Sequence, residues 1–185
     1  MLYAQLHLTL PPWVHDAIDA DRAYADADAQ VALAIELSKL NVERASGGPF
    51  GAAVFNEAGR LVGVGVNRVV AHNCSAAHAE VLALATSQQR LQRFRLNVDG
   101  TRFRLATSAQ PCAMCYGALI WAGIDEVLVG ARADDVQTLA GFDEGPLPAD
   151  WRGELERRGI AVQVDLRRDE ACAVLRAYGE SGLVY

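Results

Sequence analysis

The spacing of apolar residues predicts a chain in which strands and helices alternate. From residue 27 to 44, most apolar side chains fall on one face of a helix, and a Gly-Gly-Pro run follows as a stop signal. The short runs 51–56 and 61–67 are rich in strand-forming residues and are joined by four residues that include a glycine. This pattern predicts an antiparallel hairpin after the first helix.

The rest of the sequence continues the alternation and predicts a layered fold. Pro111 and Gly123 stand where helices favour proline at the start and glycine at the end. We expect helices at 78–95, 112–122, 134–139 and 169–178, strands at 102–108, 126–130 and 160–166, and a loop at 141–150. This order predicts an α/β fold, a three-layer α/β/α sandwich around a mixed, mostly parallel five-stranded sheet.

The length of 185 residues fits one domain. Residues 1–26 and 180–185 lack strong periodicity, so we expect an N-terminal extension and a C-terminal tail around a domain at 27–179. Every apolar stretch is interrupted by a charged residue or a glutamine before it reaches the length of a membrane helix. The first residues lack a basic region followed by an apolar stretch, so we expect a soluble protein that is not secreted.

Charge and cysteine usage narrow the classes of function. The formal net charge is −6, with 23 acidic and 17 basic residues, which argues against a protein that grips nucleic acid through many phosphate contacts. Arginines in segments 90–95 and 102–104 are interleaved with apolar residues, as on solvated faces. Four cysteines are too few for a disulfide scaffold in a chain of this length, which favours a reducing, cytoplasmic setting and a metal site.

Three possible metal ligands stand at the starts of two predicted helices. His78 begins one helix, and Cys112 and Cys115 lie in the first turn of another. One imidazole and two thiolates form a ligand set for zinc, and only three protein ligands leave a position open for water, as in catalytic sites. The helix dipole lowers thiol pKa values at a helix start and so favours the thiolates that bind metal. We therefore predict one zinc ion per chain.

Glu80 follows His78 by two residues, so its carboxylate can approach a water on the metal without taking a coordination position. We predict that Glu80 accepts and donates protons in the reaction catalysed at this metal site. The pattern His-x-Glu followed by Pro-Cys-x-x-Cys is similar to the signature of zinc-dependent base deaminases. Backbone N–H groups near Ala79 and Cys112 are expected to face substrate oxygens, because both residues lie at helix starts.

A closed structural zinc site is the alternative. Cys74 stands four positions before His78, so it could supply a fourth ligand and leave no room for water. The protein would then be a non-catalytic interaction protein stabilised by zinc. Two observations argue against a closed site. Cys74 falls in a loop before the helix predicted at 78–95, and a closed site would hold no water from which Glu80 could take a proton. Cys172, among the apolar positions of the last helix, is expected to be a core residue.

Residues 47 to 122 resemble the cytidine deaminase-like superfamily of zinc-dependent enzymes. Besides the zinc motifs, the resemblance rests on Asn67 and on the run Gly48-Pro49-Phe50-Gly51-Ala52. It is closer to the bacterial guanine deaminases, whose acidic loop after the fourth strand is similar to Ala140-Gly141-Phe142-Asp143-Glu144-Gly145. In all, the resemblance covers about residues 31–178.

The resemblance implies a flat purine base beside the zinc. Asn67 would hydrogen-bond the ring, and Phe50 or Trp121 would supply an apolar wall. Asp143 and Glu144 would accept hydrogen bonds from the amino group and the ring N–H of guanine. The reaction implied is hydrolysis of guanine to xanthine and ammonia, a step of purine catabolism. The family also implies a homodimer.

Two other deaminase functions stay open at this point. The acidic loop would also accept the amino groups of other small rings, such as cytosine, a pterin or a triazine. A tRNA adenosine deaminase shares the zinc motifs, although the acidic total and the lack of a basic tail argue against an RNA partner. The partner expected from the sequence is therefore a small molecule, a purine base.

Overall fold

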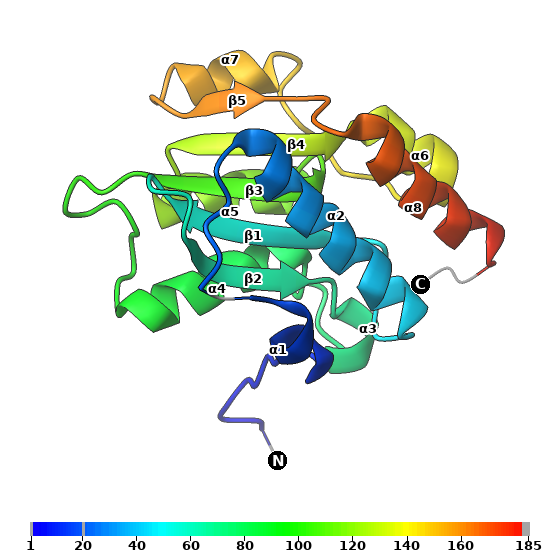
Figure 1. Ribbon diagram of the computed structural model, residues 1–185. Helices are drawn as coiled ribbons and strands as arrows, with labels where there is room; N and C mark the ends of the chain where they lie inside the picture. Colours follow the sequence, from blue (N-terminus) through cyan, green and yellow to red (C-terminus); the bar gives the residue numbers. More distant parts are fainter. Residues whose placement is uncertain (1, 20, 183–185) are drawn as a thin grey trace.

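The computed structural model describes residues 2–19 and 21–182 (Figure 1). Its centre is a five-stranded sheet with the strand order β2-β1-β3-β4-β5. The strands are β1 (Gly51–Asn56), β2 (Leu61–Val66), β3 (Phe103–Ala109), β4 (Glu126–Ala131) and β5 (Ala161–Gln163). β1 pairs antiparallel with β2 and β3, whereas β4 pairs in parallel with β3 and β5. β1 therefore runs against the other four strands, and the predicted mixed sheet is confirmed.

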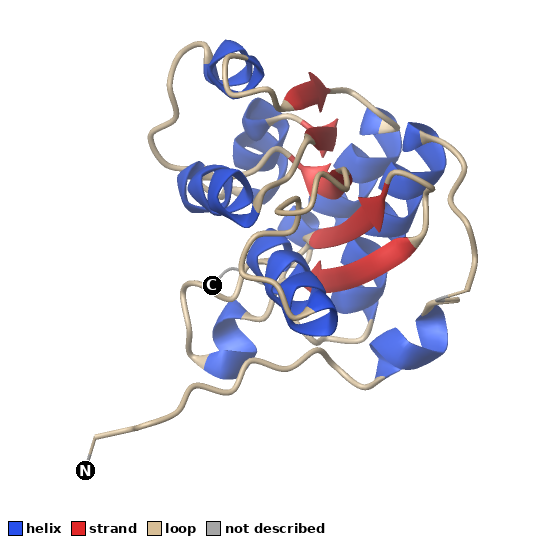
Figure 2. Ribbon diagram, turned by 90° about the vertical axis from the view of Figure 1, so that its left-hand side faces the viewer, coloured by secondary structure: helices blue, strands red, loops and turns tan. Residues whose placement is uncertain are grey.

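Helices cover both faces of the sheet, as Figure 2 shows. Helices α2, α6 and α8 share one apolar core with the sheet, and α4, α5 and α7 share the other. The helices described are α1 (Trp13–Ala17), α2 (Ala27–Glu43), α3 (Val69–His72), α4 (Ala79–Leu91), α5 (Ala113–Ala122), α6 (Ala133–Ala140), α7 (Trp151–Glu156) and α8 (Arg168–Glu180). This arrangement is the three-layer α/β/α sandwich expected from the sequence. Within the described residues, none of these helices has the length and hydrophobicity to cross a bilayer.

Some element boundaries differ from the predicted ones for local reasons. The helix predicted at 78–95 ends at Leu91, because Gln92 adopts a left-handed conformation with a φ of 55°. The last strand keeps only three residues, since Asp165 also has a positive φ and the chain turns towards α8. Helices α1, α3 and α7 have no counterpart among the predicted elements, because helices of four to six residues give too little periodicity.

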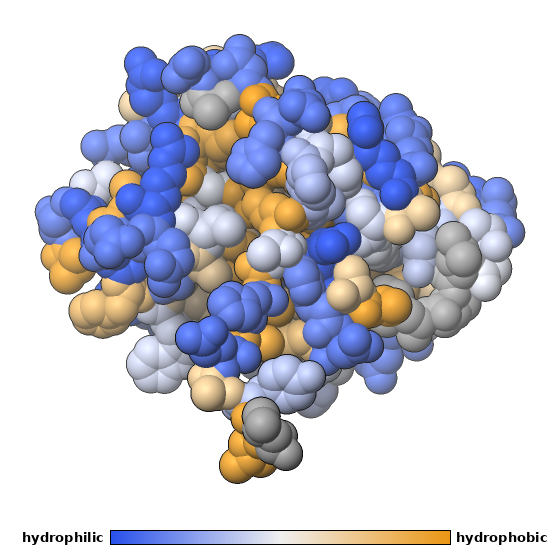
Figure 3. Space-filling model, turned by 90° about the horizontal axis from the view of Figure 1, so that it is seen from below, coloured by the Kyte–Doolittle hydropathy of each residue, from blue (hydrophilic) through white to orange (hydrophobic). Residues whose placement is uncertain are grey.

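Parts of the N-terminal segment contribute to the core. Trp13 and Val14 of α1 are buried, and so is Tyr24. Figure 3 views the molecule from the side on which α1 lies, where apolar patches appear among polar side chains. The domain boundaries at residues 26 and 179 stay predictions, and residues 183–185 of the predicted tail lie outside the described residues. Cys172 is buried in the core, as expected.

A close approach between β2 and α4 fixes the start of α4 against the sheet. A Cβ atom on Gly65 would lie 1.9 Å from the backbone oxygen of Ala79, so only glycine fits at this strand position. Ala79 is the first residue of α4, between His78 and Glu80. The start of α5 follows the end of β3 directly, after residues 110–112. These short connections bring the two helix starts that bear the predicted metal ligands next to each other.

Candidate active site

Three atoms that can bind a metal ion lie close together: Nδ1 of His78 and the Sγ atoms of Cys112 and Cys115. Nδ1 of His78 lies 3.5 Å from Sγ of Cys112 and 3.7 Å from Sγ of Cys115. The three ligand atoms all lie within 4.8 Å of one another. In a tetrahedral zinc site, bonds of about 2.3 Å to sulfur and about 2.0 Å to nitrogen place the ligand atoms about 3.5 Å apart. The spacing therefore fits one zinc ion, as the sequence predicts.

The helix starts determine where these atoms point. His78 and Cys112 directly precede the first helical residues of α4 and α5, and both have extended backbones, with ψ angles of 156° and 172°. Cys115 lies within the first turn of α5, and its backbone N–H donates to Sγ of Cys112 over 3.5 Å. With two residues between Cys112 and Cys115, both sulfur atoms therefore face the same metal position.

The two thiols differ in their pKa values, in opposite directions. The pKa of Cys112 is lowered to about 4, mainly because Cys115 and His78 hydrogen-bond to its sulfur. The pKa of Cys115 is raised, because this thiol hydrogen-bonds to Cys112 and is buried. The pKa of His78 is raised, first of all by its hydrogen bond to Cys112. A metal that takes both sulfurs as thiolates would release the remaining proton of the pair.

Cys74 does not belong to this group. Among the described residues, the cluster that could hold a metal ion consists of His78, Cys112 and Cys115. Cys74 follows α3, its backbone N–H donates to the carbonyl of Val69, and the residue is half-buried. The described part of the chain thus offers three protein ligands, which leaves one tetrahedral position for water or substrate.

Glu80 lies beside the metal ligands and is only 6% exposed. Its Oε2 is 3.4 Å from Sγ of Cys115, and its Oε1 is 3.4 Å from Oγ1 of Thr107. The pKa of Glu80 is raised, above all because burial disfavours the charged carboxylate, and also by the negative charge of Cys112. A carboxyl group whose pKa is shifted upward holds a proton more readily than a free one does, as a group that both accepts and donates a proton must.

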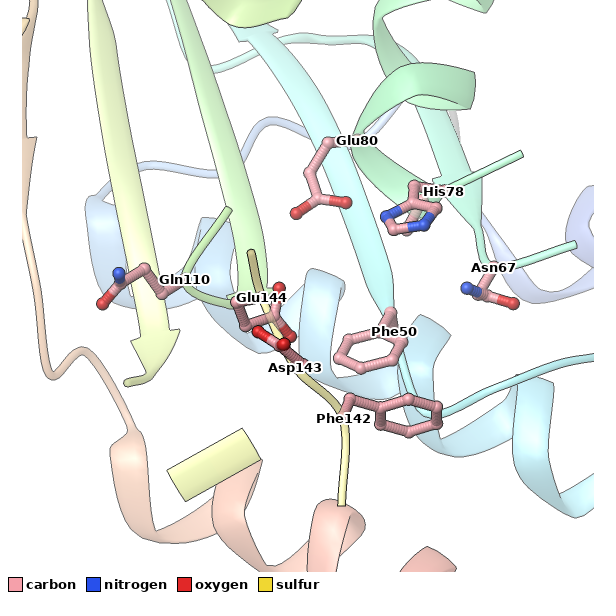
Figure 4. Close-up of a pocket in the computed structure, with 9 residues that line it drawn as sticks. Phe50, Asn67, His78, Glu80, Gln110, Phe142, Asp143 and Glu144 are labelled. Atoms are coloured by element: carbon pink, nitrogen blue, oxygen red, sulfur yellow. The ribbon is translucent and has the colours of Figure 1, made fainter. Parts of the chain in front are cut away.

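A cavity of about 180 Å³ opens next to Glu80 and His78 (Figure 4). Phe50 and Phe142 supply apolar walls, and their ring centroids lie 5.3 Å apart in an edge-to-face arrangement. Phe142 also stacks on Tyr178 of α8, with 5.9 Å between the ring centroids. The cavity is smaller than the roughly 300–1,000 Å³ of drug-sized sites, so it suits a small ring compound. Its lining residues are Phe50, Asn67, His78, Ala79, Glu80, Gln110, Phe142, Asp143 and Glu144.

The loop that bears Asp143 and Glu144 is attached to the start of α5. The backbone carbonyl of Glu144 accepts a hydrogen bond of 2.9 Å from the N–H of Ala113, directly beside Cys112. Asp143 accepts a hydrogen bond of 2.8 Å from the N–H of Gly145, which closes the turn. Burial, and then the negative charges of the neighbouring site, raise the pKa of Glu144 to about 8. Glu144 is thus a half-buried carboxyl group beside the metal ligands.

Asn67 lies on the same side of the cavity as His78 (Figure 4). Its Oδ1 accepts hydrogen bonds from the backbone N–H groups of Gly48 and Val69, over 3.4 and 3.3 Å. These contacts orient the amide so that its nitrogen is directed towards the cavity. The donor end of the Asn67 side chain therefore faces the cavity.

Trp121 does not line this cavity, contrary to what the family resemblance implies. It lies six residues after Cys115 on α5, roughly two-thirds of a turn away from the face that binds metal. Its side chain is 79% exposed, and it lines an apolar groove between α4 and α5 together with Phe94. Of the two predicted aromatic walls, Phe50 is the one at the cavity.

Gln110 and Phe142 line the cavity without being predicted as site residues. Gln110 directly precedes the Pro-Cys-x-x-Cys motif, and this position next to a metal ligand is the signal that could have identified it. Phe142 lies next to Asp143 in the acidic loop. Phe142 also packs against the apolar core, which anchors the loop.

The sequence and the fold match known zinc-binding deaminases. Residues 25–131 match the family model of the cytidine and deoxycytidylate deaminase zinc-binding region. Guanine deaminase of Bacillus subtilis is 36% identical over 111 residues, 60% of this chain and 67% of that protein. The tRNA-specific adenosine deaminase of Buchnera aphidicola is 32% identical over 128 residues, 69% of this chain and 77% of that protein. A solved structure of guanine deaminase from Nitrosomonas europaea is 46% identical, covers 97% of this chain and 99% of its own, and superposes with a TM-score of 0.91.

The matched family region includes the whole metal site. His78, Glu80, Cys112 and Cys115 all fall between residues 25 and 131, whereas the acidic loop lies beyond it. The match extends over more than half of the chain. The protein is therefore a zinc-dependent deaminase and belongs to the cytidine and deoxycytidylate deaminase family.

Proposed function

We propose that this enzyme deaminates free guanine by hydrolysis and forms xanthine and ammonia. The observation that carries the proposal is the position of Glu144, a half-buried acceptor in a small cavity beside the metal ligands and Glu80. Guanine presents an amino group and a ring N–H side by side, and a carboxylate can accept from both. These two donors would also favour the ionised form of Glu144, which its raised pKa otherwise disfavours near neutral pH. The similarity to guanine deaminases of two organisms supports the same substrate.

The walls of the cavity suit a flat base. The ring would lie against Phe50 and Phe142, with its amino-bearing edge towards Glu144. The amide nitrogen of Asn67 would donate to an acceptor on another edge of the base. The backbone of Ala79, at the first turn of α4, forms part of the wall beside the metal ligands. These contacts would hold the amino-bearing carbon close to Glu80.

Glu80 would act as the proton carrier of the reaction. Zinc held by His78, Cys112 and Cys115 would act as a Lewis acid and lower the pKa of a water in its open position. Glu80 takes a proton from the attacking water, whose oxygen bonds to the amino-bearing carbon, and protonates the neighbouring ring nitrogen. It then takes the second proton, from the added hydroxyl group, and passes it to the amine, the carbon–nitrogen bond breaks, ammonia leaves and a carbonyl group remains. The burial of Glu80 favours the protonated form that carries the proton between these groups.

Another small amino-substituted ring, such as a triazine, cytosine or a pterin, is the second candidate substrate. Glu144 would accept a hydrogen bond from the amino group of any of these rings, and also from the ring N–H that a pterin presents beside it. A tRNA adenosine is a weaker candidate, although a tRNA-specific relative is 32% identical. A polyanionic partner would have to approach a chain whose formal net charge is −6.

We also propose that the enzyme works in the cytoplasm as a homodimer. All four cysteines are unpaired, and a reducing compartment keeps the metal-binding thiols available. Phe94 and Trp121 are 84% and 79% exposed and line one apolar groove between α4 and α5. Large exposed apolar patches are typical of contact surfaces. A second copy of the chain on this surface would cover both aromatic side chains.

Glu80→Gln should lower kcat for guanine at least about 100-fold, because the amide cannot accept the proton of the attacking water. Zinc content should stay at one ion per chain, since Glu80 is not a ligand. Steady-state kinetics and metal analysis of purified protein test this. Glu57→Gln, in the exposed hairpin loop, is the matched control and should leave kcat unchanged. Near-normal turnover of Glu80→Gln would remove Glu80 from the mechanism.

Glu144→Gln should reduce kcat/KM for guanine about 10- to 100-fold, because its amide group replaces one of the two acceptor oxygens by a donor. Asp143→Asn should have a smaller effect, since Asp143 is exposed and its carboxylate closes the turn to Gly145. The conversion of guanine to xanthine is followed by absorbance, with adenine, cytosine and a diaminotriazine as competing substrates. If the wild type releases no ammonia from guanine, the substrate assignment is wrong.

Trp121→Asp should convert a dimer into a monomer, because it places a charge in the proposed contact surface. Light scattering after gel filtration measures the mass of both proteins. Val70→Asp is the control, since Val70 is 57% exposed on α3, away from this groove, and should leave the dimer intact. A wild type that is monomeric at about 50 μM, in the concentration range where dimers of ordinary strength form, contradicts the proposal.

A further inference from the structure

We propose that Asn41 is a positioning residue for the substrate cavity and that Trp13 fixes its orientation through Ser46. The identity of the substrate in this inference rests on the proposed function. Asn41 lies near the end of α2 and is fully buried. It does not line the cavity, but its side chain holds the backbone of two segments that do.

The amide nitrogen of Asn41 uses both of its hydrogens. Nδ2 donates to the carbonyl of Gly48 over 2.8 Å and to the carbonyl of Asn67 over 2.9 Å. Gly48 in turn donates from its N–H to Oδ1 of Asn67, over 3.4 Å. The backbone of Asn67 and the acceptor end of its side chain are thus tied to the same loop. This loop is what directs the amide nitrogen of Asn67 towards the cavity.

The same loop leads into an apolar wall of the cavity. The N–H of Phe50 donates to the carbonyl of Gly48 over 2.8 Å, and the carbonyl of Phe50 accepts from the N–H of Asn67 over 3.1 Å. A Cβ atom on Gly47 would lie 1.9 Å from the carbonyl oxygen of Asn67 and 2.7 Å from Nδ2 of Asn41. The packing therefore leaves little space for the loop to shift. The buried side chain of Asn41 therefore fixes the backbone of Asn67 directly and that of Phe50 through Gly48.

The orientation of the Asn41 amide is set from outside α2. The indole N–H of Trp13 donates to Oγ of Ser46 over 3.0 Å, so this hydroxyl oxygen acts as an acceptor there. The hydroxyl hydrogen is then directed at Asn41, where Oδ1 lies 2.8 Å away and the backbone carbonyl 3.2 Å away. Donation to Oδ1 identifies the other end of the amide as the donor. Trp13 thus donates to Ser46, Ser46 donates to Asn41, and Asn41 donates to the carbonyls of Gly48 and Asn67. We call this series of hydrogen bonds the relay.

A reversed amide would be costly at this buried position. Turning Asn41 over would set Oδ1 against the two carbonyl oxygens of Gly48 and Asn67, and both would lose the hydrogen bond from Nδ2, so that Gly48 kept only the N–H of Phe50. Unsatisfied buried polar groups are strongly disfavoured. The described bonds of this relay reach the segments of Phe50 and Asn67 but not the metal ligands or Glu80. Its loss should therefore weaken substrate binding more than the chemical step.

Three variants interrupt the relay at successive points. Trp13→Phe keeps an aromatic ring but lacks the N–H, Ser46→Ala removes the hydroxyl link, and Asn41→Asp replaces the donor nitrogen by oxygen. KM for guanine should rise at least about threefold in the first two variants and at least about tenfold in Asn41→Asp, the range expected for lost hydrogen bonds. The value of kcat should stay within about twofold, and zinc at one ion per chain.

Trp151→Phe is the matched control, because it makes the same exchange in α7, outside the relay, and should leave KM unchanged. The double variant Trp13→Phe/Ser46→Ala should raise KM no more than Ser46→Ala alone, since either change breaks the same path. Multiplying effects, or an unchanged KM in both Trp13→Phe and Ser46→Ala, would overturn the proposal. Both outcomes are measured on variants of Trp13 and Ser46, so the test remains decisive even if Asn41→Asp fails to fold.

A second measurement needs no substrate. Nuclear magnetic resonance of ¹⁵N-labelled zinc-loaded protein should find slow solvent exchange of the Asn41 side-chain amide hydrogens in the wild type, and exchange at least about tenfold faster in Ser46→Ala. Equal exchange rates would overturn the relay whatever the substrate is. If the relay responds but guanine is not deaminated, the proposed function fails instead, and KM is compared for the ring compound that the wild type does deaminate.

Discussion

The active site depends on two helices that must begin within one metal coordination sphere of each other. His78 and Cys112 directly precede α4 and α5, and their ligand atoms are only 3.5 Å apart. The glycine contact between β2 and α4 and the short connection from β3 to α5 hold the two starts in this relation. Because metal–ligand bond lengths vary little, a small shift of either helix would separate the three ligands. The order of the strands thus determines the distance between the ligand atoms of His78 and Cys112.

Substrate recognition is built onto the same helix start. The N–H of Ala113, one residue after Cys112, holds the carbonyl of Glu144, so the acidic loop and a metal ligand share one turn of α5. Phe142 anchors the loop between Phe50 and Tyr178. The group that binds metal and the group that would bind the amino-bearing edge of a base therefore keep a fixed distance. This alignment explains how a small cavity could direct one carbon of a ring at the open metal position.

The sequence predicts those parts of the site whose geometry is local. The ligands and Glu80 follow from short spacings at helix starts, and the hairpin and α2 follow from clear periodicity. Trp121 could not be placed, because α5 is apolar on nearly all sides and its pattern does not tell which face packs on the sheet. Phe142 was missed since its role depends on Tyr178, which is far away in sequence. Contacts of that kind arise only when separate elements pack together.

X-ray absorption spectroscopy of the zinc-loaded protein distinguishes an open three-ligand metal site from a closed one. For the open site we predict a four-coordinate zinc ion with two sulfur atoms at about 2.3 Å and two lighter atoms at about 2.0 Å, one from His78 and one from water. The same spectrum is expected from Cys74→Ser. A third sulfur ligand in the wild type that is lost in Cys74→Ser would mean that Cys74 closes the site and that no position is open for water.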